Sequence, residues 1–151
     1  MDIRFETKNS FYVSGYPTET TEASLEKDCA ILREKYESKL RSVSNRFFFA
    51  SYMSKDGAPV LPMTDGGVMI YLFGVEAGSQ TPVTEGATCI AIPAARFAVA
   101  AVPKGAPILA AWHEFFEKGI PEIGAEIDMN YMFYFEAFDE NGACELWIPV
   151  K

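Results

Sequence analysis

One stretch of the chain organises the rest: Tyr131-Met132-Phe133-Tyr134-Phe135-Glu136-Ala137-Phe138. Successive side chains of a strand point to opposite faces of its sheet, and both sets of positions here are aromatic, so the stretch predicts a strand in the middle of a sheet. Its one ionisable residue is Glu136. Because a carboxylate among aromatic rings loses hydration, we expect Glu136 either to meet a cationic or hydrogen-bonding partner or to have a raised pKa. Our hypothesis is that the missing partner is a ligand.

The composition indicates a globular protein with a substantial core. The chain has 151 residues, of which 49% are apolar, 23% charged and 14% aromatic. This length suits one domain over residues 1–151, and the aromatic surplus indicates either a large core or a cavity lined with rings. The formal net charge of −8 repels phosphate backbones, so direct nucleic-acid binding is not expected. The same charge favours cationic small molecules, but only weakly.

Neither a metal site nor a cofactor is predicted. The three cysteines, Cys29, Cys89 and Cys144, are far apart and form no Cys-x-x-Cys pair, which indicates reduced thiols in a cytoplasmic protein. His113 is the only histidine, which excludes a His-rich metal site. The sequence shows no signal-peptide pattern and no apolar run long enough for a membrane span.

The first half of the chain, residues 11–75, predicts the order strand, helix, strand, strand. Pro17 and the threonines after it should end the first strand and cap the helix. Apolar residues recur every three or four positions in this helix, at Leu25, Cys29, Leu32, Tyr36 and Leu40, while charged residues such as Glu26 and Arg33 should face solvent. The predicted strands cover 11–16, 47–53 and 68–75, the helix runs from 22 to about 41, and a turn-rich connection covers 54–67.

The second half, residues 96–150, repeats this order after a short strand at 87–92. Its helix should begin near Pro107 and end near Gly119, because Pro121 prevents continuation. Asn141-Gly142 between two apolar runs predicts a hairpin. The predicted strands of this half cover 97–102, 131–138 and 143–150.

The repeated order predicts an α+β fold. We expect duplicated strand-helix-strand-strand modules, about 11–75 and 96–150, that form one curved antiparallel sheet with two main helices. A two-fold arrangement leaves a groove where the halves meet, and such grooves are common ligand sites.

Four segments carry a resemblance to a known family: Tyr-Leu-Phe-Gly-Val-Glu at 71–76, Ile-Pro-Ala-Ala-Arg-Phe-Ala-Val at 92–99, Phe-Glu at 135–136 followed by Phe138, and Ile-Pro-Val at 148–150. In this order they resemble segments of the GyrI-like small-molecule-binding domain, which is the effector-binding domain of AraC-type and multidrug-responsive regulators. Phe97 and Phe138 stand where that family has tyrosine, so any contact made by those hydroxyls is missing here.

The resemblance implies a groove that takes hydrophobic, often cationic, compounds, with a glutamate at the Glu136 position facing the cation. The argument from the residues points to the same side chain, since a carboxylate among ring faces suits a delocalised cation. Alternation also places Met132 and Tyr134 on the face of Glu136, and would leave Phe133 and Phe135 facing the helices.

The candidate ligand-binding residues are Glu136, Tyr134, Met132, Tyr71, Met69, Phe73, Tyr52, Trp147 and Trp112. Glu136 has an alternative interpretation, in which it pairs with Arg96 or Arg46 or faces water. For the tyrosines and tryptophans the alternative is an ordinary place in the core. For Trp112 the core is the favoured interpretation.

Three functions remain open from the sequence. The leading hypothesis is a binding module for hydrophobic or cationic small molecules. It would be a free-standing sensor or sequestering protein linked to transcription regulation or drug and toxin resistance, since no basic helix-turn-helix segment is visible. The second is a hydrolase of reactive cyclopropane-type genotoxins, which the resemblance allows, with Glu136 acting on a water molecule. The third is an inhibitory protein-interaction module. A protein partner or a homodimer is compatible with each.

Overall fold

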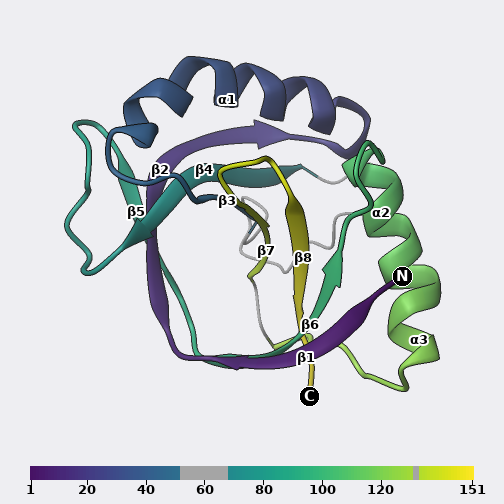
Figure 1. The fold of residues 1–151 in the computed structure, drawn as a ribbon. Coiled ribbons are helices and arrows are strands. Elements are labelled where there is room, and N and C mark those ends of the chain that lie inside the picture. The colour runs from purple at the N-terminus through teal and green to yellow at the C-terminus, as the bar shows by residue number, and fades with distance from the viewer. Residues whose placement is uncertain (52–67, 131–132) are drawn as a thin grey trace.

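The computed structural model describes residues 1–51, 68–130 and 133–151. Within these residues eight strands form one antiparallel sheet in the order β1-β6-β8-β7-β3-β4-β2-β5 (Figure 1). The strands are β1 (Ile3–Lys8), β2 (Phe11–Thr20), β3 (Phe47–Ser51), β4 (Met69–Ala77), β5 (Thr88–Ile92), β6 (Ala95–Ala101), β7 (Tyr134–Phe138) and β8 (Cys144–Pro149).

The sheet is symmetric about its central strand pair, β7 and β3. On one side of the pair the order is β7-β8-β6, and on the other side it is β3-β4-β2, so the three strands of each predicted module lie together. Glu136 of β7 is paired in register with Phe49 of β3, which places Glu136 where the two modules meet. The predicted α+β fold with one curved antiparallel sheet is confirmed.

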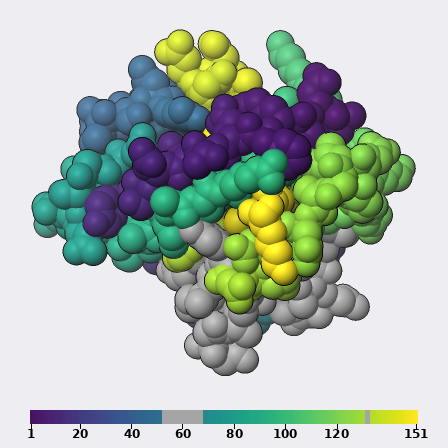
Figure 2. Space-filling view, turned by 90° about the horizontal axis from the view of Figure 1, so that it is seen from below, coloured from purple at the N-terminus to yellow at the C-terminus, as the bar shows by residue number. Residues whose placement is uncertain are grey.

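Two further strands extend the edges of the sheet. β5 pairs with β2, and β1 pairs with β6, so each of these strands lies beside the first strand of one module. β1 precedes the first module in sequence but pairs with the second; Figure 2 shows its purple segment crossing one face of the molecule. The sequence prediction included β5 but missed β1.

The first strand of the first module, β2, continues beyond Pro17 to Thr20, so the expectation that Pro17 ends the strand is wrong. β5 pairs only with residues 11–15 of β2, so no described strand pairs with the remainder of β2 on that side. Proline has no N–H to donate and is tolerated at such an edge.

The first helical segment is close to its prediction. A 3₁₀ turn, η1 (Glu22–Ser24), leads into α1 (Leu25–Arg41), and the Thr21 backbone N–H donates to Ser24 Oγ at 3.3 Å. The helix buries Leu25, Leu32 and Leu40 and packs on β2 and β4 (Figure 1).

The second helical segment does not stop at Gly119, contrary to the sequence prediction. It consists of α2 (Ile108–Glu114), a π-helical turn η2 (Phe115–Gly119) and α3 (Ile120–Glu122), which follow one another without a break (Figure 1). Pro121 follows directly on the π-helical turn, in which Ile120 N–H donates to the Phe115 carbonyl oxygen, so its missing N–H falls where the regular hydrogen-bond pattern of the helix is already interrupted. Pro107 caps the start of α2, close to where the sequence placed it.

The two faces of the sheet carry separate apolar clusters. The helix-facing cluster joins residues of α1 and α2 to the outer sides of the strands, and includes Leu32, Trp112, Tyr134 and Phe138. The second cluster contains no helix residue, and five of its buried side chains are aromatic: Phe11, Phe48, Phe97, Phe135 and Trp147.

Contacts between aromatic rings in the second cluster show that the sheet is curved. β2 and β7 are separated by two strands, or roughly 14 Å in a flat sheet. The ring centroids of Phe11 and Phe135 nevertheless lie 5.5 Å apart, so the sheet curls toward this face (Figure 1).

The expectation that Phe133 and Phe135 face the helices is therefore wrong. Phe135 lies in the second cluster and Phe133 packs against it, while Tyr134 and Glu136 lie on the helix side. Strand alternation shows which residues share a face, but it does not show which face the helices cover.

The β7–β8 hairpin confirms the turn prediction. Asp139 Oδ1 accepts hydrogen bonds from the backbone N–H groups of Asn141 and Ala143, and Gly142 has a φ of 80°.

None of the described helices is both long and apolar enough to cross a membrane. Tyr52 and Met132, both predicted site residues, lie outside the described residues.

Candidate functional site

Glu136 is held on the helix-facing side of β7. Its side chain is 4% exposed, although it carries a carboxyl group. The alternation of β7 directs Tyr134 and Phe138 to the same side, and α1 and α2 cover that side. The alternative that Glu136 faces water is therefore wrong.

The one hydrogen bond to Glu136 within the described residues comes from Trp112 Nε1, which lies 3.3 Å from Glu136 Oε2. Burial raises the pKa of Glu136 to about 7, while the indole hydrogen bond and the positive charge of Arg33 act in the opposite direction. The carboxyl group is therefore poised to change its ionisation near neutral pH.

Arg96 and Arg46, the arginines considered as partners of Glu136, both lie elsewhere. Arg96 Nη1 donates to the Lys151 carbonyl oxygen at 3.2 Å, and its guanidinium lies 4.2 Å from the Phe5 ring centroid. The Arg46 guanidinium lies 5.4 Å from the Phe48 ring centroid, and Phe48 belongs to the second cluster. The ion-pair alternative with these two residues is wrong.

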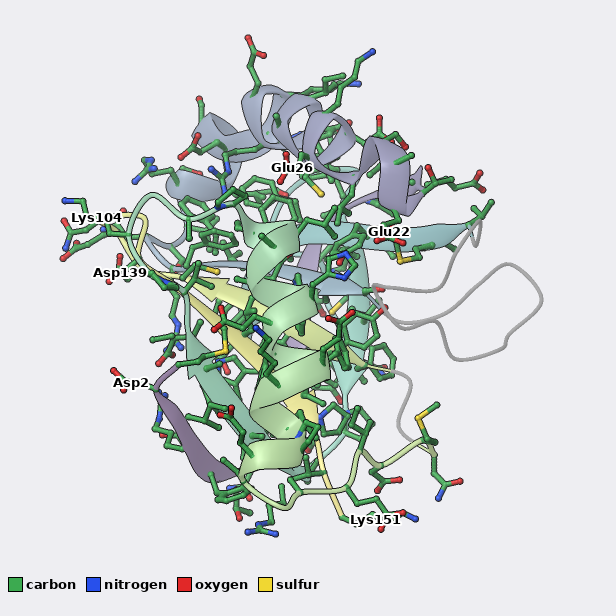
Figure 3. The ribbon with its side chains drawn as sticks, turned by 90° about the vertical axis from the view of Figure 1, so that its right-hand side faces the viewer. Asp2, Glu22, Glu26, Lys104, Asp139 and Lys151 are labelled. Carbon is green, nitrogen blue, oxygen red and sulfur yellow. The ribbon has the colours of Figure 1, made fainter. Side chains whose placement is uncertain are left out.

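A cavity of about 200 Å³ adjoins Glu136, and we call it the inner cavity. It lies between α1, the start of α2, and strands β3 and β7. Its lining residues are Leu25, Glu26, Cys29, Ala30, Arg33, Phe49, Ile108, Leu109, Glu136 and Phe138. Glu26 and Ala30 are exposed and mark its rim, and Figure 3 shows Glu26 between α1 and α2. Residues of both modules thus line this cavity.

Arg33 is the one basic residue among the described residues that line the inner cavity. Its guanidinium carbon lies 4.9 Å from the Phe138 ring centroid and 5.5 Å from that of Phe49. These distances are typical of cation–π contacts. Arg33 therefore already occupies part of the aromatic surface beside Glu136.

A group of buried polar atoms lies behind the inner cavity. Tyr134 Oη lies 3.1 Å from Ser51 Oγ and 4.0 Å from Met69 Sδ. Tyr71 is fully buried, and its hydroxyl has no hydrogen-bond partner among the described residues. Burial raises the pKa of Tyr71, and the nearby charge of Glu136 adds to this effect, so its hydroxyl stays neutral.

A side-chain contact near this site also connects α2 to η1, the turn that precedes α1. His113 Nε2 on α2 lies 2.8 Å from Glu22 Oε1, in the turn before α1, on the side of the molecule that faces the viewer in Figure 3. Within the described residues, no group of three or more His, Cys, Asp or Glu side chains is placed to hold a metal ion.

Comparison with known proteins assigns this architecture to a family. The model of Cass2, described as an integron-associated effector binding protein, matches residues 4–150. The chain belongs to the Cass2 family. The resemblance to GyrI-like effector-binding domains is thereby confirmed, and effector binding is the function that the family description names. No curated protein matches the chain.

Solved structures share the fold of this Cass2-family chain at low sequence identity. The structure of SAV2435 bound to tetraphenylphosphonium has a TM-score of 0.72 at 14% identity, with 100% of this chain and 94% of that chain covered. The integron cassette protein VCH_CASS2 of Vibrio cholerae has a TM-score of 0.68 at 14% identity, with 99% and 95% covered. The C-terminal domain of EcmrR has a TM-score of 0.54 at 11% identity, with 99% and 97% covered.

The structure brings together part of the residue set predicted for the site. Trp112 bonds to Glu136, and Tyr71, Tyr134 and Met69 lie in the same helix-facing cluster. Phe73 also belongs to this cluster, where its ring stacks on Phe49 at 4.7 Å. Of the predicted set, Glu136 lines the described inner cavity directly, and the others named here form the wall behind it or the core around it.

Trp147 is not brought to the inner cavity, which corrects the expectation that it lines a pocket with Glu136. It pairs in register with Phe135, and residues paired directly across two strands share a face. Its ring stacks on Phe135 at 5.2 Å and meets Phe97 edge-on at 5.6 Å, all within the second cluster.

Helix α1 contributes side chains to the site that its sequence pattern does not predict in this Cass2-family chain. The pattern places Cys29 in the core and Arg33 in solvent, yet both line the inner cavity. The signal was present, because Leu25, Cys29 and Arg33 are spaced by four residues and so share one helix face. Burial raises the pKa of the Cys29 thiol, which keeps it neutral and makes it a poor nucleophile.

Proposed function

We propose that this protein binds hydrophobic organic cations in the inner cavity, with Glu136 as their counter-ion. One observation carries the proposal: a carboxyl group that is 4% exposed lies against a cavity and receives a single hydrogen bond from the described residues. Burying a carboxylate is unfavourable unless it is paired. A bound cation would supply the pairing that the protein leaves incomplete.

The surroundings of Glu136 suit a delocalised charge. The rings of Phe49 and Phe138 line the same cavity, and a ligand cation that contacts the part of a ring that Arg33 leaves uncovered gains roughly 0.5–2 kcal/mol. Charge pairing is also stronger here than at the surface because the Glu136 carboxyl group is buried. A cation would favour the ionised form of Glu136, so binding is coupled to loss of its proton.

The relatives support this assignment. The family is described as effector-binding, and a protein of the same fold was solved with tetraphenylphosphonium, a hydrophobic cation. We include in the proposal that the protein acts as a sensor or sequestering protein, since two structures of the same fold are described as a transcription regulation protein and as part of a DNA complex.

The test is a calorimetric titration of tetraphenylphosphonium into wild-type protein and Glu136→Gln. We expect the variant to bind about 10- to 100-fold more weakly, as expected for loss of a desolvated charge partner. Glu140→Gln is the matched control, because it removes the same charge from the exposed β7–β8 turn. The affinity of wild type should rise between pH 6 and pH 8, since the pKa of Glu136 is about 7. Equal affinity of Glu136→Gln and wild type at pH 8 would reject the counter-ion role.

A second candidate function is hydrolysis of a strained electrophile such as a cyclopropane. A carboxyl group with a pKa of about 7 is well placed to accept a proton from water at neutral pH. The Tyr71 hydroxyl, which has no partner among the described residues, would polarise the substrate. Turnover that disappears in both Glu136→Gln and Tyr71→Phe would support this function. Binding of the electrophile without turnover would exclude hydrolysis and leave cation binding as the proposed function.

A further inference from the structure

We propose that the ligand is amphoteric: its cationic part lies at Glu136, and an anionic group on the same molecule binds Arg33 and Lys104. This inference rests on the proposed function and specifies the chemical class of the ligand. The observations behind it are a second hollow next to the inner cavity, the partners of Arg33, and the separation of charges between the two hollows.

The second hollow, which we call the outer pocket, has a volume of about 400 Å³. It shares Arg33, Ile108 and Phe138 with the inner cavity, so these three side chains form the boundary between them. Its far side is formed by the turn that carries Lys104 and by the β7–β8 turn. Figure 3 shows Lys104 and Asp139 at this edge of the molecule.

The inner cavity is too small to hold a drug-sized ligand by itself, so such a ligand must extend beyond it. Pockets for drug-sized ligands measure roughly 300–1,000 Å³, whereas the inner cavity measures about 200 Å³. The outer pocket adjoins it directly across Arg33. A ligand that fills the inner cavity and continues past Arg33 therefore enters a basic environment.

Arg33 has no carboxylate partner among the described residues; its contacts there are the rings of Phe49 and Phe138. By contrast, Arg4 pairs with Glu145 and Arg41 with Glu37. A guanidinium forms its strongest contacts with carboxylate or phosphate oxygens through two parallel hydrogen bonds. Within the described residues, no carboxylate therefore pairs with the donors of Arg33, which lie at the boundary of the two hollows.

The two hollows differ in their charged residues. Glu26, Arg33 and Glu136 line the inner cavity, whereas the described lining of the outer pocket contains Arg33 and Lys104 but no acidic residue. A simple cation at Glu136 is repelled by Arg33, which lines the same cavity. An anionic group on the ligand, directed toward Arg33, turns this repulsion into attraction.

The test compares ligands that share one hydrophobic chain. Dodecyltrimethylammonium is the simple cation, and the dodecyl carboxybetaine and dodecyl sulfobetaine add an anion one and three carbons from the nitrogen. All are used below their micelle concentrations, and affinities are measured by calorimetry with wild type, Arg33→Gln, Arg33→Lys, Lys104→Gln and Lys27→Gln. Lys27 is the matched control, because it is an exposed cation of α1 that lines neither hollow.

We expect at least one betaine to bind wild type about 5- to 10-fold more tightly than the simple cation. Arg33→Gln should abolish this preference by weakening the betaine and strengthening the simple cation, and Lys104→Gln should reduce it. Arg33→Lys should retain part of it, and Lys27→Gln should leave it unchanged. A preference for the simple cation in wild type, or one that Arg33→Gln does not alter, would overturn the inference.

The two proposals fail differently. If the simple cation binds in a Glu136-dependent way but neither betaine is preferred, the amphoteric ligand is excluded and the cation site remains. If Glu136→Gln binds the simple cation as well as wild type does, the proposed function fails, and this inference fails with it.

Discussion

The indole of Trp112 on α2 donates a hydrogen bond to Glu136 on β7, with Nε1 and Oε2 3.3 Å apart. This bond links the second helix to the central strand pair at the point where the two modules meet. It satisfies part of a buried carboxyl group whose pKa burial raises to about 7. The consequences for stability can be measured without any ligand.

Glu136→Gln should make the protein more stable at pH 8 than wild type. The folded state holds the Glu136 proton up to a pKa of about 7, whereas the unfolded chain releases it near the ordinary glutamate pKa of 4.5. The folded state therefore binds more protons between these values, and wild type loses stability as the pH rises from 4.5 to 7. The loss reaches about 3 kcal/mol at most, from about 1.4 kcal/mol for each pKa unit.

Denaturant unfolding of wild type and Glu136→Gln from pH 5 to pH 8 tests whether the stability of wild type falls as the pH rises. The difference in the free energy of unfolding should grow in favour of Glu136→Gln up to about pH 7 and then level off. Glu140→Gln, with the same chemical change in the exposed turn, should show a difference that is flat with pH. A flat difference for Glu136→Gln would contradict the raised pKa.

Trp112→Phe should raise the pKa of Glu136 further. The substitution keeps an aromatic ring in the helix-facing cluster but removes the N–H that favours the ionised carboxylate. Titration of the Glu136 side-chain carboxyl carbon by NMR measures the change directly. Trp147→Phe is the control, because Trp147 lies in the second cluster and its Nε1 has no partner among the described residues. An unchanged titration in Trp112→Phe would show that the indole bond does not stabilise the carboxylate.

Gly74→Ala should destabilise the protein by more than about 3 kcal/mol. A Cβ at Gly74 would meet the backbone carbonyl of Ser14 in the paired strand β2, and backbone atoms cannot move aside without breaking the β2–β4 pairing. Gly78→Ala, four residues later, is the control: a Cβ there meets nothing within 4 Å, so its stability should stay within about 0.5 kcal/mol of wild type. Thermal unfolding of both variants measures the contrast. Similar midpoints for the two variants would mean that the close approach at Gly74 can relax.

The fold could be derived from the sequence because its signals are periodic. The three- and four-residue spacing of the apolar residues Leu25, Cys29, Leu32, Tyr36 and Leu40 predicted a helix, and Asn141-Gly142 between apolar runs predicted a hairpin. β1 was missed because four of its six residues are polar, and an edge strand buries few side chains. Pro121 misled the prediction because a proline usually ends a helix, whereas here it follows directly on the π-helical turn inside a continuous helical segment.

The candidate site was predictable only in part. Glu136 was identified because an acidic residue in an aromatic strand is unusual whatever the fold. Trp147 was wrongly predicted to line the same pocket as Glu136. Two residues that are close in a hairpin share a face of the sheet only if the pairing register places them there, and Trp147 pairs with Phe135. Arg33 was missed because a charged residue at the edge of an apolar helix stripe looks solvent-facing until the opposing strand is known.

Tyr71→Phe should leave the stability of the free protein unchanged or raise it, whereas Tyr134→Phe should lower it. The Tyr71 hydroxyl is fully buried with no partner among the described residues, so removing it removes an uncompensated polar group. The Tyr134 hydroxyl lies 3.1 Å from Ser51 Oγ, and its loss leaves that serine without this contact, at a cost of about 1 kcal/mol. Denaturant unfolding of the two variants compares one hydroxyl deletion with another in the same cluster. Equal destabilisation by both would mean that the Tyr71 hydroxyl has a partner in the free protein, and would remove its availability to a ligand.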